Sequence, residues 1–217
     1  MNQSWPGEPD VLEDSSESAV VEPLPEPEPA EPEPDEPELE PAAERTHTQH
    51  AAGDIDIPDD VRVLEGEPGP LRRAIAIVVA KFNGEITTQL LDSALTELDE
   101  IGVDRGQVTV VPVPGAFELP LASMALAKTR RYSCVIALGC VIRGETPHFD
   151  YVASEAASGL QLAALETGVP IAFGVLTTED EAQARARVGR GADAVRTGLE
   201  LADSFARLRA AASAATA

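Results

Sequence analysis

The segment Arg143–Asp150 (RGETPHFD) gathers residue types suited to chemistry on a charged small molecule. Gly144 permits close approach of a ligand to the backbone, and Thr146 offers a hydroxyl and an N–H group near an expected helix start. His148 follows in the first turn, and the other two histidines lie before residue 51. Imidazole exchanges protons near neutral pH, so this pattern favours an acid–base group beside a small phosphate site. The alternative is a surface or capping histidine.

Further segments carry residues that could bind the rest of a planar, phosphorylated ligand. Phe82 follows an apolar run and could stack on a ring, or could instead cap the core. Glu118 follows a Pro-Val-Pro-Gly turn whose N–H groups could contact a ligand, although a glutamate there also complements the helix dipole. Any of Arg185, Arg187 and Arg190 could hold a phosphate by a bidentate contact. The residues alone leave that choice open.

These residues follow apolar segments that alternate with helical patterns. Apolar runs predict strands at 74–80, 107–111, 134–142 and 169–176. Helices are expected at 86–101, 117–128 and 147–166, from about 179, and at 192–209. Asn83 is a candidate N-cap for the first helix, and Gly102 is expected to end it. The alternation predicts a four-stranded parallel sheet with helices on both faces, and ligands bind such sheets beyond the carboxyl ends of the strands.

Charge and proline divide the chain into unlike parts. Residues 1–70 hold 21 acidic and two basic residues, whereas the remainder holds 17 acidic and 14 basic ones. Thirteen of the 18 prolines also lie at or before position 70. Such a composition cannot bury enough apolar surface to order itself, so we interpret residues 1–65 as a disordered tail. The tail could be merely solvated or could tune solubility, assembly or partner choice. Residues 66–209 form the expected domain, and 210–217 an Ala-rich C-terminal tail.

Several functional classes are disfavoured by the same sequence. No basic stripe suits nucleic acid, and no stretch of 18 apolar residues suits a membrane span. No secretory segment begins the chain, and Cys134 and Cys140 lie roughly 20 Å apart along one expected strand, too far to bridge. No metal-ligand cluster, P-loop or serine elbow is present. The residues indicate a cytoplasmic α/β enzyme that acts on a phosphorylated small molecule by acid–base chemistry.

Four segments in consistent order resemble the lumazine synthase family. They are AKFNGEIT at 80–87, VPGAFELP at 113–120, ALGCVIRGETPHFDYVASEA at 137–156 and VPIAFGVLTTEDEAQARAR at 169–187. The resemblance covers roughly residues 66–205, and it implies a flavodoxin-like three-layer α/β/α sandwich. It also implies condensation of 5-amino-6-(D-ribitylamino)uracil with 3,4-dihydroxy-2-butanone 4-phosphate to 6,7-dimethyl-8-ribityllumazine, phosphate and water. This is the penultimate step of riboflavin biosynthesis, and the family uses no metal or organic cofactor.

The resemblance also implies a substrate-binding role for particular positions. They are Phe82, Ala116, Phe117, Glu118, Cys140, Val141, Ile142, Glu145, Thr146, Phe173 and Arg187. Phe82 matches the aromatic that stacks on the pyrimidinedione ring, and Ala116–Glu118 the segment beside the ribityl chain. The backbone of Cys140–Ile142 matches the strand end that forms hydrogen bonds with the edge of the ring.

The remaining positions concern the phosphate and proton transfer. Glu145 and Thr146 match the phosphate loop, and Arg187 matches the arginine that completes the phosphate site. His148 matches the proton-transfer residue. Phe173 matches a pocket wall that the neighbouring subunit contributes.

The resemblance finally implies an assembly. Family members form homopentamers with sites shared between adjacent subunits, some build shells of twelve pentamers, and riboflavin synthase is a candidate protein partner. This chain departs from the family at Val188–Gly191, where the link between two helices is several residues shorter, and Ser154 stands where Asn is common. The short link puts shell formation in doubt.

Overall fold

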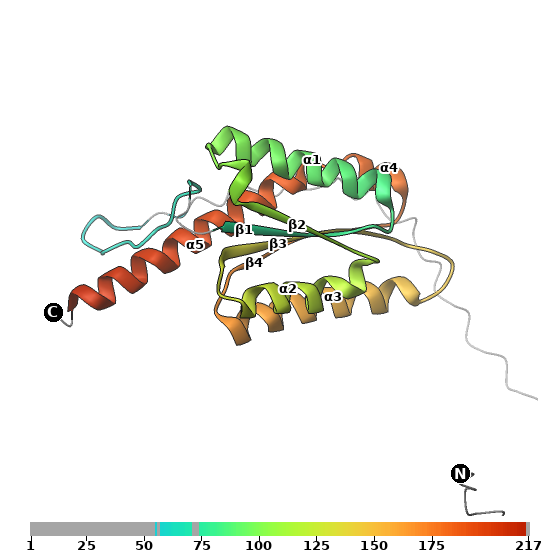
Figure 1. Ribbon diagram of the computed structural model, residues 1–217. Helices are drawn as coiled ribbons and strands as arrows, with labels where there is room; N and C mark the ends of the chain where they lie inside the picture. The colour runs from blue at the N-terminus through green and yellow to red at the C-terminus, as the bar shows by residue number, and fades with distance from the viewer. Residues whose placement is uncertain (1–54, 56, 71–73, 216–217) are drawn as a thin grey trace, which may run out of the picture. The chain divides into compact units, whose positions relative to one another are not determined.

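The computed structural model describes residues 55, 57–70 and 74–215, and the chain divides into two units, 1–56 and 57–217. The prediction of a disordered tail therefore falls mostly outside the described residues. The second unit is the α/β domain drawn in Figure 1.

The domain contains a four-stranded parallel sheet of order β2-β1-β3-β4, which confirms the predicted fold class. The strands are β1 (Ala74–Ala80), β2 (Val108–Val113), β3 (Tyr132–Ile142) and β4 (Ile171–Thr178). The helices are α1 (Gly84–Ile101), η1 (Arg105–Gln107), η2 (Ala116–Glu118), α2 (Leu119–Lys128), α3 (His148–Thr167), α4 (Glu181–Arg185) and α5 (Arg190–Ala215). Helices α1 and α5 cover one face of the sheet, and α2 and α3 cover the other (Figure 1).

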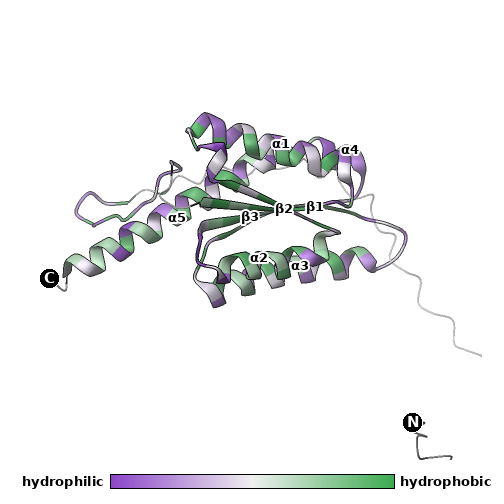
Figure 2. Ribbon diagram, viewed as in Figure 1, coloured by the Kyte–Doolittle hydropathy of each residue, from purple (hydrophilic) through white to green (hydrophobic). Residues whose placement is uncertain are grey.

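The core lies on both faces of the sheet because side chains of a strand alternate in direction. Ile75 and Ile77 of β1 pack toward α1 and α5, whereas Ala76 and Val78 pack toward α2 and α3. A strand covered on both sides needs apolar residues throughout, which explains the continuous run of β1. Figure 2 shows this apolar interior between more polar outer helix faces.

Some element boundaries differ from the predicted ones for identifiable reasons. Strand β2 was predicted to stop at residue 111, but it continues through Pro112 to Val113. Because β2 is an edge strand, the missing N–H of Pro112 removes no essential ladder bond. Strand β4 begins and ends two residues later than predicted. Helix α5 starts two residues early and runs six residues beyond the predicted end at Arg209, because the Ala-rich segment contains no helix breaker.

The residues at both caps of helix α1 are the predicted ones, but the Asn83 side chain bonds elsewhere. Gly102 ends the helix in the left-handed region, at φ 87°, where glycine is favoured. Asn83 does occupy the N-cap position, but its side chain makes no capping bond. It instead donates from Nδ2 to the carbonyl oxygen of Cys140 at 2.9 Å. The side chain thereby joins the start of α1 to the end of β3.

Residues 57–70 form no helix or strand, and part of this segment packs on α5. The Glu67 N–H donates to Asp203 Oδ2 at 3.1 Å, and Gly66 is buried. A Cβ at Gly66 would lie 2.1 Å from the carbonyl oxygen of Glu200, so only glycine permits this approach.

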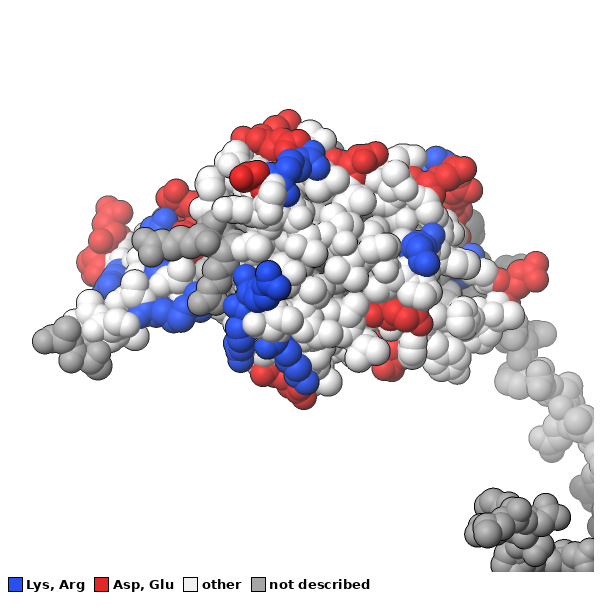
Figure 3. All heavy atoms as spheres, viewed as in Figure 1, with Lys and Arg blue, Asp and Glu red and all other residues white. Residues whose placement is uncertain are grey.

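Charged groups on the surface are mixed in sign. Figure 3 shows acidic and basic side chains interspersed on one face. Ion pairs to carboxylates involve Arg105, Arg143, Arg185, Arg190, Arg196 and Arg207. None of the described helices is both long enough and apolar enough to cross a membrane.

The short link before α5 depends on a close helix crossing. A Cβ at Gly191 would lie 2.1 Å from the carbonyl oxygen of Leu90 in α1, whereas one at Gly189 would meet nothing within 4 Å. We therefore expect Gly191→Ala to lower the free energy of unfolding by about 1–3 kcal/mol. Gly189→Ala should change it by less than about 0.5 kcal/mol. Urea denaturation of both variants tests this, and equal midpoints would contradict the tight crossing.

Candidate active site

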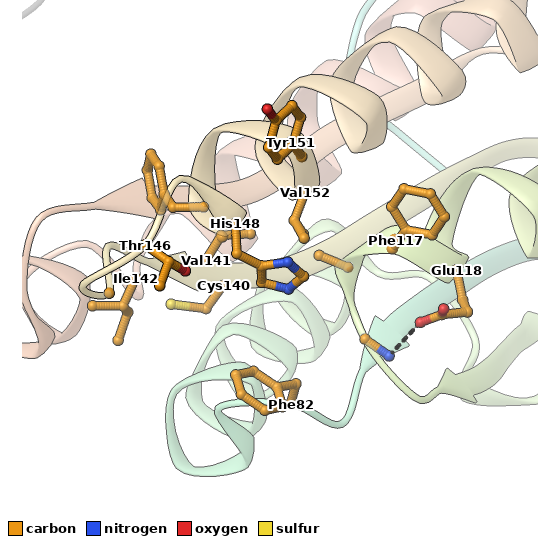
Figure 4. A pocket seen from close by; sticks show the side chains of 14 residues that line it. Phe82, Phe117, Glu118, Cys140, Val141, Ile142, Thr146, His148, Tyr151 and Val152 are labelled. Carbon is orange, nitrogen blue, oxygen red and sulfur yellow. Dashed lines mark hydrogen bonds between the residues drawn. The ribbon is translucent and has the colours of Figure 1, made fainter. Parts of the chain in front are cut away.

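A cavity of about 590 Å³ lies at the carboxyl ends of β1, β2 and β3 (Figure 4). This is where a parallel sheet binds ligands, beside the change in strand order between β1 and β3. The predicted positions that line it are Phe82, Ala116, Phe117, Glu118, Cys140, Val141, Ile142, Thr146 and His148. The chain thus brings four separated segments to one cavity.

Phe82 is held at the cavity wall by the backbone around it. The Lys81 N–H donates to the carbonyl oxygen of Val113 at 2.8 Å, and that of Phe82 to Pro114 at 3.1 Å. The Phe82 side chain nevertheless remains 71% exposed. A core-capping phenylalanine would be buried, so this alternative is excluded. An open ring on a fixed loop can stack on a planar ligand.

The turn after β2 places Glu118 at the side of the cavity across from Thr146 and Ile142 (Figure 4). Its Oε2 accepts a hydrogen bond from the Gly115 N–H at 2.9 Å, so the carboxylate holds the turn that begins η2. Within the described part of the chain, Oε1 accepts no hydrogen bond. The carboxylate can therefore hold the turn with one oxygen and accept from a ligand hydroxyl with the other.

The end of β3 exposes backbone groups to the cavity. Pairing with β1 ends at Leu138, whereas pairing with β4 continues to Ile142. One edge of residues 139–142 therefore lacks a neighbouring strand. Asn83 already donates to the carbonyl oxygen of Cys140, and the other polar groups of this edge can meet a ligand. Cys140 is only 2% exposed, and burial raises the pKa of its thiol to about 11. The thiol stays protonated at neutral pH and acts as part of the apolar wall, not as a nucleophile.

The loop between β3 and α3 carries the remaining polar groups. Thr146 lines the cavity, and His148 begins α3 directly after Pro147. Figure 4 shows the imidazole of His148 pointing into the cavity, on the side where Phe82 lies. A histidine in this position can exchange a proton with a bound ligand, as the sequence suggested.

Three predicted positions do not line this cavity: Glu145, Phe173 and Arg187. Phe173 lies on β4, at the edge of the sheet, and is 48% exposed. Arg187 follows α4 and donates from Nη1 to the carbonyl oxygen of Gln183 at 2.9 Å. A single chain therefore does not bring its own Phe173 or Arg187 to the cavity.

Gly115 and Gly144, which the sequence placed in turns that could contact a ligand, also line the cavity. Three further lining residues were missed from the sequence: Phe149, Tyr151 and Val152. Tyr151 and Val152 follow His148 by three and four positions. Helical residues at these spacings share a face, so this signal was present in the sequence. Across the described residues, no three His, Cys, Asp or Glu side chains gather to hold a metal ion.

Known proteins resemble this chain over most of the α/β domain. The family model described as 6,7-dimethyl-8-ribityllumazine synthase matches residues 72–207. The chain is 50% identical over 147 residues to the protein of that name from Yersinia pestis (strain Pestoides F), covering 65% of this chain and 94% of the relative. The protein of the same name from Yersinia pseudotuberculosis serotype O:1b (strain IP 31758) shows the same identity and coverage. The chain belongs to the 6,7-dimethyl-8-ribityllumazine synthase family.

Proposed function

We propose that this chain condenses 5-amino-6-(D-ribitylamino)uracil with 3,4-dihydroxy-2-butanone 4-phosphate in the cavity at the ends of β1, β2 and β3. The products are 6,7-dimethyl-8-ribityllumazine, phosphate and water, in the penultimate step of riboflavin biosynthesis. One observation carries the proposal: nine of the twelve positions implied by the family resemblance line a single cavity.

The cavity offers a suitable group for each part of the pyrimidine substrate. Phe82 stacks on the pyrimidine ring. Backbone groups of Cys140–Ile142 on the side without a neighbouring strand form hydrogen bonds with the polar atoms at the edge of that ring. Glu118 accepts from hydroxyls of the ribityl chain with the oxygen that Gly115 leaves free. These contacts fix the amino group of the uracil against the carbonyl of the second substrate, which favours the bimolecular step.

The reaction then requires proton transfers and the loss of phosphate. The amine and the ketone form a Schiff base, phosphate leaves, and the ring closes. His148 moves protons in these steps, since its imidazole points into the cavity (Figure 4). Thr146 and the N–H groups of its loop bind the phosphate, with Glu145 in the same loop.

A second copy of the chain completes the part of the cavity that binds the phosphate. In this proposal Arg187 and Phe173 of one subunit reach the cavity of its neighbour in a homopentamer. Both lie on or after the edge strand β4, and neither lines its own cavity. Large apolar side chains such as Leu121 and Leu165 are about three-quarters exposed on α2 and α3, at 76% and 75%. A subunit interface would cover such residues.

The remaining assignments follow from the same proposal. The catalytic domain spans residues 66–209, preceded by the acidic tail of residues 1–65 and followed by 210–217. The enzyme works in the cytoplasm on small-molecule substrates, with riboflavin synthase as the candidate protein partner. The short link at Val188–Gly191 favours a pentamer over a shell of pentamers.

Phe82→Ala tests the proposed ring platform. Loss of the stacked ring should weaken binding of the lumazine product about tenfold, since stacking and the associated burial contribute about 1.5 kcal/mol. Titration of the product, followed by its fluorescence anisotropy, measures this affinity. Leu208→Ala removes a half-exposed apolar side chain of α5, outside the cavity, and serves as the control. Equal affinity in Phe82→Ala and the wild type would remove the ring platform from the proposal.

A further inference from the structure

Arg143, the first residue after β3, joins three elements around the cavity. Its N–H donates to the carbonyl oxygen of Thr178 at the end of β4, at 2.9 Å. Its side chain donates from Nε to Glu179 Oε2 at 2.8 Å. The same guanidinium pairs through Nη1 with Asp150 Oδ1 in the first turn of α3, at 3.2 Å. The end of β3, the end of β4 and the start of α3 therefore meet at this one residue.

A fourth contact reaches the cavity wall. The guanidinium carbon of Arg143 lies 4.2 Å from the centre of the Phe149 ring, and Phe149 lines the cavity. A planar guanidinium can stack on a ring and still donate in its own plane to two carboxylates. A lysine ammonium lacks this geometry.

The loop between these contacts has little other support. Gly144, Glu145 and Thr146 form no hydrogen bonds with the rest of the described residues, and all three are exposed. The shape of the loop therefore depends on how its two ends are held. The pair between Arg143 and Asp150 ties those ends together across seven positions. A loop closed in this way has fewer conformations to lose when it binds a ligand.

We propose that Arg143 is a positioning residue that holds the loop Gly144–Pro147 in the shape that binds the phosphate of the second substrate. The proposal rests on the function proposed above, in which Thr146 belongs to the phosphate site. The Arg143–Asp150 pair fixes the loop, and the Arg143–Glu179 pair fixes its position relative to β4.

If Arg143 instead acted through its charge alone, replacing its partner Asp150 would have the opposite effect on phosphate binding. If the guanidinium attracted phosphate by itself, neutralising Asp150 would leave more positive charge near the loop and strengthen phosphate binding. If the pair acts as a clamp, losing either member loosens the same loop, so both variants weaken binding. The sign of the Asp150 effect therefore separates the two roles.

The experiment compares full-length wild type with Arg143→Met, Arg143→Lys, Asp150→Asn and the Arg143→Met/Asp150→Asn double variant. Inorganic phosphate is the probe, measured as an inhibitor competing with the butanone phosphate, and KM is measured for both substrates. Each single variant should raise the inhibition constant of phosphate and the KM of the butanone phosphate about fivefold to tenfold. The KM of the ribitylaminouracil should change less than about twofold, and the double variant should resemble the single ones. Arg105→Met is the matched control, because Arg105 is a half-exposed arginine paired with Asp99 before β2, away from the cavity.

Each contrary result has a separate meaning. Tighter phosphate binding in Asp150→Asn, or wild-type behaviour of Arg143→Lys, would overturn the clamp in favour of simple charge attraction. Phosphate binding by the wild type that none of the variants alters would overturn the clamp alone. A wild type that neither binds phosphate nor forms product would overturn the proposed function, and the clamp with it. Arg143 is 40% exposed, so the variants should fold, and circular dichroism with thermal melting confirms this.

Discussion

Replacing His148 by alanine is expected to lower kcat about 100-fold or more, because a positioned acid–base group commonly contributes 10²- to 10⁴-fold. The imidazole points into the cavity from the first turn of α3, while the ring platform and the ribityl-binding turn come from other segments (Figure 4). The KM values should therefore change little. Loss confined to kcat is the signature of a group that acts in the transition state.

The measurement is steady-state formation of lumazine at varied concentrations of each substrate. Gln161→Ala provides the control, since Gln161 lies exposed on the same helix outside the cavity. An unchanged kcat in His148→Ala would remove this residue from the mechanism, and a rise confined to KM would assign it to binding alone.

Replacing Arg187 by methionine is expected to raise the KM of the butanone phosphate about 100-fold. A charge-assisted contact between arginine and phosphate contributes about 2–3 kcal/mol, and 1.4 kcal/mol corresponds to a factor of ten. The matched control is Arg185→Met, because Arg185 belongs to the same region but is paired with Glu85 and Glu181. We expect its kinetic constants to stay close to those of the wild type.

Mixed oligomers test whether Arg187 serves the neighbouring subunit. At a butanone phosphate concentration near the wild-type KM, chains carrying Arg187→Met and chains carrying His148→Ala should each have little activity. In a mixed oligomer they would complement each other where their surfaces meet. In a ring assembled at random from equal amounts, about a quarter of the sites would combine an intact His148 with an intact Arg187. Co-expressed oligomers should therefore recover about a quarter of the wild-type activity. No recovery would show that both residues serve a site within one chain.

The three layers of the fold and most of the cavity-lining residues could be predicted, because local sequence patterns determine them. The apolar run 74–80 indicates a strand covered on both faces, and α1 ends at Gly102 because few other residues adopt its left-handed conformation. Since ligands bind at the carboxyl ends of parallel strands, the segments after β1, β2 and β3 were expected to meet. Phe82, Glu118 and His148 do meet there.

Other features depend on contacts that a local pattern does not contain. Pro112 is tolerated in β2 only because that strand lies at the edge, and strand order follows from the whole fold. The Asn83 side chain contacts Cys140, 57 positions away, and so does not cap its own helix. Arg143 joins Asp150 to Glu179 only after β3 and β4 have paired.

The central claim is that this chain forms 6,7-dimethyl-8-ribityllumazine in the cavity. The most direct test mixes purified full-length protein with both substrates and follows absorbance near the lumazine band, with the uncatalysed rate subtracted. We predict a rise that depends on protein concentration and requires both substrates. No rise from folded protein that still binds a lumazine analogue would contradict the claim, and would identify the chain as a ligand-binding scaffold of the same fold.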